Sequence, residues 1–444
     1  MTFCPWCYII LTMDDIKLPG GDRFSRDDRA IIIKLNGERR VLSTSAHNGG
    51  CRENLSHLFN YCEVYGTTNE RCEMRAPTYD QHLSMLAEEL DLNPRTTTGL
   101  STAAKMKYLR VQTENYADFS VTVMATGGID ANGSRAGDPA LWREKDGIPT
   151  PLKPGTINLI IFIDAHLLEG TLTRALVTAT EAKTAALQEV LAPSCYSRGL
   201  ATGSGTDGTI IVSNLESPVR LTDAGQHSKL GEYIGRVVKN TVKAALAAEN
   251  GFSSYACSSV LRRIRRFGID EDSLWELFRS KAQFCRQVEK GAEKLEKRIF
   301  QQRLEQINKD SRLIMRVSMY AHLLDLLYWR LVDPEQAAGM AEELLKGAAG
   351  QVIALSEQVG TDLSGQGRAT VDQCGAELAG SDKSGCDLSG RTMAEIDEAL
   401  PPRPAVSGRT NEEAAEELIN YLGSFLVLRI ANLKDGCNAQ DKNS

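Results

Sequence analysis

Four loops carry polar side chains beside glycine, a pattern found where the backbone must approach a reacting group. Each contains asparagine, aspartate or histidine, and they lie at residues 43–50, 126–138, 201–208 and 224–228. Glycine is also the default residue of tight turns, so each loop taken alone is consistent with a plain turn. The four together favour a ligand or reaction site.

The third of these loops, Ala-Thr-Gly-Ser-Gly-Thr-Asp-Gly, runs directly into the apolar stretch 209–213. A dinucleotide-binding loop follows a strand and opens a helix, so that the helix N-terminus faces the phosphate. The opposite order here argues against a nucleotide phosphate. The backbone N–H groups near Gly203 and Gly205 can still bind an anion or an oxyanion. Thr206 and Asp207 are then candidates to position a water or a substrate amide.

Three charged or titratable side chains lie on or beside predicted helices. His227 precedes a helix start, whose positive end keeps imidazole neutral and able to act as a base, although a histidine hydrogen-bonded at a helix start fits equally well. Lys183 lies in an apolar row of the predicted helix 171–190, with Thr171 as its N-cap, and Glu181 projects roughly opposite. The two are either a desolvated functional pair or a snorkelling lysine and a surface glutamate. Locally, the pattern favours function for Lys183 and a surface position for Glu181.

Common catalytic and metal-binding signatures are absent from the sequence. It contains no HExxH, GxSxG or GxxxxGK[ST] pattern. Its six histidines show no metal-ligand spacing with the cysteines. The sequence therefore gives no metal site.

Charge and apolar patterning exclude two classes of partner. The formal net charge of −7 argues against a nucleic-acid binder, which would be basic. The longest apolar run, residues 313–332, is interrupted by Arg316, His322, Asp325 and Arg330, so it predicts a buried soluble helix and no membrane span.

The N-terminus and the eleven cysteines bear on the compartment. The first residues have no basic n-region, so we expect no secretory signal and reduced thiols in a cytoplasm. Cys4-Pro-Trp-Cys7 is similar to a redox pair but lacks the preceding strand that such a pair needs. We therefore assign residues 1–28 to a leader of unclear structure.

Strand and helix patterns alternate over residues 29–250 and predict an α/β domain with a layered sheet and packed helices. Residues 30–45 predict a hairpin with a type I′ turn at Asn36-Gly37. Buried strands are expected at 119–125, 157–164 and 209–213. Helices are expected at 79–90, 99–108, 171–190 and 229–248, the last of them capped by Ser228.

The rest of the chain has a different character, with no strand pattern. We expect an all-α region at 256–348, a flexible Gly-, Ser- and Asp-rich linker at 351–409, and a C-terminal helix at 410–434. Thr410 and Glu413 form a capping-box pattern at the start of that helix. Our default expectation for this half is a module for a protein partner or for self-association.

Five stretches of the α/β half resemble the adenosylcobinamide amidohydrolase family of corrinoid salvage. They agree with it in order and spacing, and they lie at 42–50, 123–139, 155–190, 201–213 and 224–238. The resemblance implies hydrolysis of the amide that joins the aminopropanol arm to the corrin ring of adenosylcobinamide, giving adenosylcobyric acid and aminopropanol. It implies no separate cofactor, because the corrinoid substrate itself carries the cobalt. Ser204 stands where we expect threonine in this family, which keeps the hydroxyl.

The residues can be assigned roles in such a hydrolysis, which needs an activated water or nucleophile, oxyanion donors and an acid for the leaving amine. His227 or Asp207 is the candidate base, and Lys183 or protonated His227 the candidate acid. Attack by water ranks slightly above attack by Thr206, and both stay open. The candidate substrate-binding residues are Asn48, Gly49, Asp138, Asn158, Glu181, Gly203 and Gly205.

A rival hypothesis needs no catalysis. In that hypothesis the loops only bind a corrinoid or a phosphate, and the helical half binds a protein partner.

Overall fold

The computed structural model describes residues 16–64, 74–140, 156–252, 258–283, 292–349 and 400–432. The chain divides into two compact units between Cys257 and Ser258. Cys4 and Cys7 lie outside the described residues, as does most of the predicted linker.

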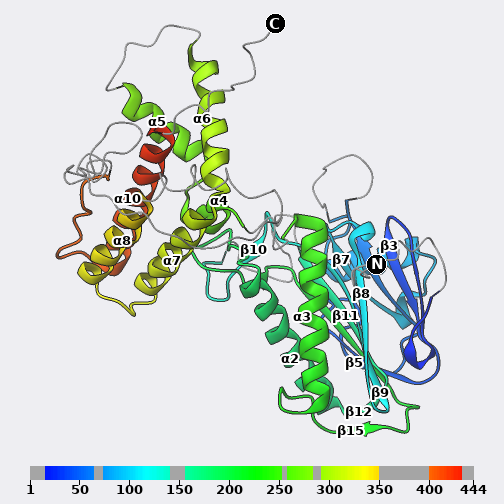
Figure 1. Ribbon diagram of the computed structural model, residues 1–444. Helices are drawn as coiled ribbons and strands as arrows, with labels where there is room; N and C mark the ends of the chain where they lie inside the picture. Colours follow the sequence, from blue (N-terminus) through cyan, green and yellow to red (C-terminus); the bar gives the residue numbers. More distant parts are fainter. Residues whose placement is uncertain are drawn as a thin grey trace, which may run out of the picture. The chain divides into compact units, whose positions relative to one another are not determined.

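Two sheets and three helices form the first unit in four layers (Figure 1). One sheet has the strand order β1-β2-β3-β6-β7, with β1 at Ile16–Lys17, β2 at Arg23–Arg26, β3 at Ala30–Lys34, β6 at His57–Cys62 and β7 at Thr97–Thr102. The other has the order β5-β4-β14-β11-β9-β8, with β5 at Gly50–Arg52, β4 at Arg39–Ser43, β14 at Gly208–Asn214, β11 at Thr156–Ile163, β9 at Phe119–Gly128 and β8 at Arg110–Tyr116.

Two short pairs complete the strands of this unit. They are β10 (Gly133–Ser134) with β13 (Gly203–Ser204), and β12 (His166–Leu167) with β15 (Arg220–Leu221). Single-turn 3-10 helices lie at Pro19–Gly21, Pro94–Thr96 and Met106–Tyr108.

Side-chain alternation along β11 shows how the layers are held together. Ile157, Leu159 and Ile161 contribute to the core under helices α2 (Glu169–Glu189) and α3 (Lys229–Asn250). Ile160 and Phe162 contribute to a second core that also contains Ile31 and Ile33 of the other sheet. Because successive strand residues point to opposite faces, one apolar strand serves both cores.

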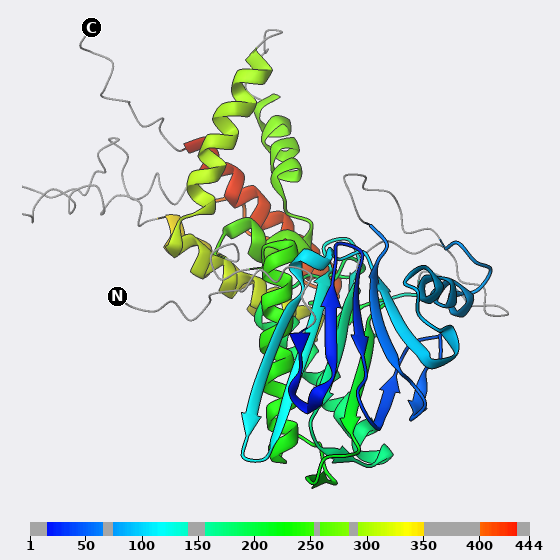
Figure 2. The ribbon, with the colours of Figure 1, turned by 90° about the vertical axis from the view of Figure 1, so that its right-hand side faces the viewer.

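Helix α1 (Tyr79–Glu89) covers the outer face of the five-stranded sheet through Leu83, Leu86 and Ala87. It is the short blue helix of Figure 2, on the opposite side of the sheets from the green α3. The α/β class with packed helices is confirmed, and the strands 119–125, 157–164 and 209–213 are confirmed with small shifts of their ends.

The helix starts agree in part with prediction. Ser228 caps α3 as predicted, since its hydroxyl accepts from Gly231 N at 3.0 Å. The predicted cap of α2 is wrong, because that helix begins at Glu169 after Leu168, and Thr171 lies buried inside its first turn. Strand β12 ends at Leu167, so the chain enters α2 directly after it, two residues before Thr171.

The predicted hairpin at 30–45 is also wrong. Strands β3 and β4 do not pair, because β3 lies between β2 and β6 whereas β4 lies between β5 and β14. The Asn36-Gly37 turn, with Gly37 at a φ of 80°, therefore carries the chain from one sheet to the other. The predicted type I′ turn is wrong as well, because it needs a positive φ at both central residues and only Gly37 has one.

Two other predicted assignments need correction. Residues 99–108, expected as a helix, form the end of β7 and a short 3-10 turn, because β7 pairs in parallel with β6 and its threonines suit a strand. Residues 16–28, assigned to a leader, carry β1 and β2, and β2 pairs with β3. The sheet thus begins upstream of residue 29.

A buried ion pair joins the start of the chain to both sheets. The Arg39 guanidinium donates Nε to both oxygens of Asp22 at 3.1 Å, and it also reaches Gly20 O and Asn214 Oδ1, each at 2.7 Å. The Arg39 and Asp22 side chains are only 1% and 3% exposed. Asp22 accepts Asn36 N at 2.8 Å as well, so the same carboxylate holds the turn between the sheets.

We predict that Arg39→Met destabilises the first unit by about 3–5 kcal/mol, because Asp22 is left buried without its cation. The measurement is urea unfolding followed by circular dichroism. Glu53→Gln is the matched control on the same sheet edge, since it breaks the Arg40–Glu53 pair at a carboxylate that is 53% exposed. That control should change stability by less than about 1 kcal/mol, and an equal effect of both variants would contradict the prediction.

In its described residues, the second unit contains helices and no strand. Its elements are α4 at Val260–Ile264, a 3-10 turn at Arg265–Phe267, α5 at Glu271–Gln283, α6 at Ala292–Asn308, α7 at Ser311–Tyr328, α8 at Pro334–Ala349 and α10 at Asn411–Asn432.

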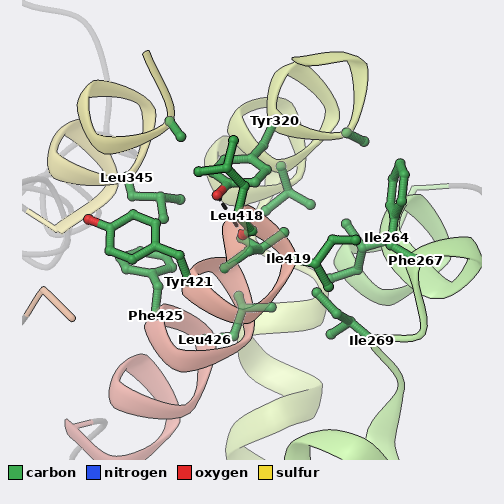
Figure 3. Close-up of a cluster of buried hydrophobic side chains, with 14 of the residues drawn as sticks. Ile264, Phe267, Ile269, Tyr320, Leu345, Leu418, Ile419, Tyr421, Phe425 and Leu426 are labelled. Carbon is green, nitrogen blue, oxygen red and sulfur yellow. Dashed lines mark hydrogen bonds between the residues drawn. The ribbon is translucent and has the colours of Figure 1, made fainter. Parts of the chain in front are cut away.

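The core of this unit is centred on α7 and α10 (Figure 3). Tyr320 is fully buried there, and its hydroxyl donates to Leu418 O at 2.7 Å. The capping box is confirmed, with Glu413 N donating to Thr410 Oγ1 at 3.3 Å and Thr410 N to Glu413 Oε2 at 2.8 Å. In the part of the chain that the structure describes, no helix is long and apolar enough to cross a membrane.

Candidate active site

Three of the four glycine-bearing loops meet at one end of the six-stranded sheet. Gly128 at the end of β9 pairs with Thr156, and Gly208 at the start of β14 pairs with Asn158. Ser43 at the end of β4 pairs with Ile210 near that same start. The loops 43–50, 126–138 and 201–208 therefore share one edge, and the last two pair directly as β10 and β13.

The Asp207 carboxylate is the centre of this edge. Its Oδ1 accepts Ile157 N at 2.8 Å and Ser204 Oγ at 2.6 Å. Its Oδ2 accepts Ser204 N at 3.0 Å and the ammonium of Lys183. Four donors thus converge on two oxygens, which fixes the carboxylate in one orientation.

Lys183 reaches Asp207 from α2, with both side chains only 10% exposed. The snorkelling interpretation of this lysine is therefore wrong, because its ammonium is paired inside the protein. Next to it on α2, the Thr184 hydroxyl donates to Thr202 O at 3.0 Å and ties the helix to the loop. A catalytic role for Lys183 stays a prediction.

The neighbouring side chains explain why residue 203 is a glycine, but they do not explain the glycine at 205. A Cβ on Gly203 would lie 2.5 Å from Asp207 Oδ2 and 3.3 Å from Lys183 Nζ, so a side chain there would displace the ion pair. A Cβ on Gly205 would lie 3.9 Å from Asn132 Oδ1, which is an ordinary contact. Gly205 is exposed, and its N–H has no hydrogen-bond acceptor among the described residues.

Hydroxyl and amide groups extend the cluster toward the surface. Ser204 Oγ lies 3.4 Å from Thr206 Oγ1 and also accepts Thr206 N at 3.3 Å. The buried Asn132 accepts the Tyr196 hydroxyl at 2.7 Å and directs its amide at Thr206 Oγ1, 3.5 Å away. Sequence reasoning did not give Ser204 or Tyr196 a role, although the serine stood inside the glycine loop and Tyr196 carried no local signal.

Asn158 lies at this edge, but its side chain joins the two sheets. Its amide donates to Asn60 Oδ1 at 2.8 Å and to Ser101 O at 2.9 Å, and its oxygen accepts Gly208 N at 3.0 Å. Asn60 in turn donates to Thr126 Oγ1 at 2.9 Å. With its donors and acceptor engaged inside the fold, Asn158 supports the site and is not directed at a ligand.

Asn48 and Gly49 also serve the fold. The Asn48 amide donates to Pro94 O at 2.7 Å and Thr97 O at 2.8 Å, and its backbone has a φ of 49°. A Cβ on Gly49 would overlap the Ser45 carbonyl oxygen. The geometry therefore assigns this turn to docking the loop on β7, in place of the predicted substrate binding.

Asp138 ties two loops of the site together. Its Oδ2 accepts Arg135 N at 2.8 Å and Ser194 Oγ at 2.6 Å. Burial alone would raise the pKa of the Asp138 carboxyl, but hydrogen bonds from Ser194, Ser197 and Arg135 outweigh it and lower the pKa below its ordinary value. The charged carboxylate holds the 193–200 loop beside β10.

His227 and Glu181 are not brought to this edge. Both are exposed; the Glu181 carboxylate accepts the amide of Gln226 at 2.6 Å. His227 precedes the start of α3, beyond β15, whereas the other end of α3 contacts the site edge through Asn250 and Ile129 N. The fourth loop packs against α2, where the Thr178 hydroxyl donates to Ala224 O at 2.7 Å.

Comparison with known proteins identifies the relatives of the first unit. A family model described as adenosylcobinamide amidohydrolase matches residues 15–254, more than half of the 444 residues. The chain belongs to the adenosylcobinamide amidohydrolase family. The resemblance seen in the sequence is thereby confirmed, and every residue of the Asp207 cluster lies inside the matched range.

Two curated relatives each match about half of this chain. An uncharacterized protein of Methanocaldococcus jannaschii is 32% identical over 258 residues, covering 54% of this chain and 97% of that protein. An adenosylcobinamide amidohydrolase of Methanosarcina mazei is 30% identical over 233 residues, covering 49% of this chain and 94% of that protein. Among solved structures, a Pyrococcus horikoshii protein aligns with 54% of this chain and 83% of its own at 13% identity and a TM-score of 0.28.

Within the described ranges, no group of three or more histidine, cysteine, aspartate or glutamate side chains is arranged to hold a metal ion.

Lys183→Met should destabilise the first unit by about 3–5 kcal/mol, because it leaves the Asp207 carboxylate nearly buried without a cation. Unfolding in urea measures this. The control is Glu181→Gln on the same helix, which changes an exposed carboxylate that accepts the Gln226 amide. It should change stability by about 0.5 kcal/mol or less, and similar losses in the two variants would show that the ion pair does not anchor α2.

The two loop glycines should respond differently to alanine. Gly203→Ala overpacks the Asp207–Lys183 contact and should cost about 1–3 kcal/mol. Gly205→Ala, in an exposed turn with room for a Cβ, should stay within about 0.5 kcal/mol. Melting temperatures of the two variants test this, and a larger loss for Gly205→Ala would mean that the loop is packed differently.

Proposed function

We propose that this chain hydrolyses the amide joining the aminopropanol arm to the corrin ring of adenosylcobinamide, releasing aminopropanol and leaving adenosylcobyric acid. The observation that carries the proposal is the family match over residues 15–254. The polar cluster around Asp207 supports it, because it lies inside that range and offers the groups that amide hydrolysis requires.

Lys183 and Asp207 act in this proposal as a coupled pair. The ammonium orients the carboxylate, and the carboxylate accepts a proton from the attacking hydroxyl group. When it does so, the pair becomes net positive, which stabilises the negative charge that develops on the amide oxygen. These roles revise the predicted ones, in which Lys183 was the acid and His227 an alternative base.

The oxyanion donor in this proposal is the Gly205 N–H. It is exposed at the cluster and engages no acceptor among the described residues, so a substrate carbonyl can take that position. Such a donor stabilises the tetrahedral intermediate through a fixed dipole, and losing one costs about a hundred- to a thousandfold in turnover.

The direct experiment is incubation of the purified full-length protein with adenosylcobinamide, with aminopropanol and the corrinoid acid followed by liquid chromatography and mass spectrometry. Release of both products at equal amounts supports the proposal. Tight binding of the corrinoid without release of aminopropanol would contradict it and favour the rival hypothesis of a non-catalytic corrinoid-binding protein.

Asp207→Asn should lower turnover by about a hundred- to ten-thousandfold, whereas His227→Ala should stay within about threefold of wild type. The first substitution removes the proton acceptor, and the second changes an exposed side chain at the far end of α3. Steady-state rates of aminopropanol release measure both. A large loss in His227→Ala with normal folding would restore histidine to the mechanism.

A further inference from the structure

We propose that the Ser204 hydroxyl is the nucleophile of the hydrolysis and forms a covalent ester with the corrinoid acyl group. This inference rests on the proposed function and goes beyond it, since direct attack by water would serve the same overall reaction. It also differs from the sequence hypothesis, which named Thr206 as the covalent alternative.

The contact between Ser204 and Asp207 carries the assignment. Ser204 Oγ donates to Asp207 Oδ1 at 2.6 Å, so the hydroxyl proton already points at a carboxylate. That carboxylate is in turn oriented by Lys183 and by Ile157 N. A nucleophile within hydrogen-bond reach of a base, with the base held by a third group, is the arrangement that activates a hydroxyl for covalent catalysis.

Thr206 is less suited to the role. Its hydroxyl lies 3.4 Å from Ser204 Oγ, and it is that serine hydroxyl which donates to Asp207 Oδ1. Thr206 N donates to Ser204 Oγ, which holds the serine hydroxyl in place. Ser204 is half-buried, and it lies next to the exposed Gly205.

Adjacent residues then supply both halves of the reaction. In serine hydrolases of other folds, the backbone N–H of the residue after the nucleophile stabilises the oxyanion. Gly205 follows Ser204, and its N–H engages no acceptor in the described part of the chain. The lack of a side chain at this position leaves space for the substrate carbonyl.

The steps balance without any further reagent. Ser204 Oγ bonds to the amide carbon as its proton passes to Asp207, giving a tetrahedral intermediate. The carbon–nitrogen bond then breaks, and the nitrogen takes the proton from Asp207 and leaves as aminopropanol. Water attacks the resulting ester and gives one proton to Asp207, the carbon–Oγ bond breaks, and Ser204 recovers the proton as the corrinoid acid departs.

The test compares full-length wild type with Ser204→Ala, Ser204→Thr and Thr180→Val on adenosylcobinamide. Ser204→Ala should lose at least about a thousandfold in aminopropanol release, as expected for removal of a nucleophile. Ser204→Thr, which keeps a hydroxyl, should exceed Ser204→Ala. Thr180→Val, which removes an exposed hydroxyl that donates to Leu176 O within α2, should match wild type. Circular dichroism establishes that each variant is folded.

Hydroxylamine added to the wild type gives a second readout that does not depend on any variant. An ester intermediate is intercepted, so corrinoid hydroxamate forms beside the acid. Absence of hydroxamate means direct attack by water and overturns the assignment even if Ser204→Ala is inactive. A corrinoid adduct mapped to Thr206 overturns it as well.

The outcomes separate this inference from the function on which it rests. If the wild type releases no aminopropanol, the proposed function fails and the nucleophile assignment fails with it. If the wild type releases aminopropanol and Ser204→Ala does so within about threefold, the function stands and only the assignment of Ser204 is overturned.

Discussion

The Lys183–Asp207 ion pair is the interaction on which the site edge depends. Its carboxylate gathers donors from the start of β11, from α2 and from its own loop, so three segments distant in sequence are fixed by one group. A nearly buried charge is costly unless it is paired and hydrogen-bonded, and Asp207 is both. These bonds hold the loop in place and direct the Ser204 hydroxyl at the Asp207 carboxylate.

A second polar network holds the two sheets in register beneath this edge. Thr126, Asn60 and Asn158 form a chain of hydrogen bonds that ends at Gly208 N, and it crosses from one sheet to the other. The Arg39–Asp22 pair makes a comparable connection around the turn between β3 and β4. A buried network whose hydrogen bonds are all made fits only one packing arrangement, whereas apolar contacts alone tolerate several. The position of the loop 201–208 over β11 is thus set by the interior as well as by Asp207.

Family membership and the geometry of the site concern the same part of the chain. The match ends at residue 254, close to the division between the two compact units. The helical unit has its own core around Tyr320 and Leu418. Catalysis and any role of the helical unit are therefore separable questions.

The sequence by itself determined the elements and the chemistry of the loops. Alternating apolar runs, Ser228 and the Thr410–Glu413 box gave correct strands and helix starts, because these signals act over a few residues. They also marked Lys183, Thr206 and Asp207, which the fold brings together. Only the tertiary structure decided which strands pair, so β3 and β4 separated into two sheets despite the predicted hairpin turn. It also left His227 at the far end of α3, and it engaged Asn48 and Asn158 inside the fold. The reason is that pairing, burial and side-chain partners depend on residues far apart in the chain, such as 183 and 207, whose proximity no local pattern encodes.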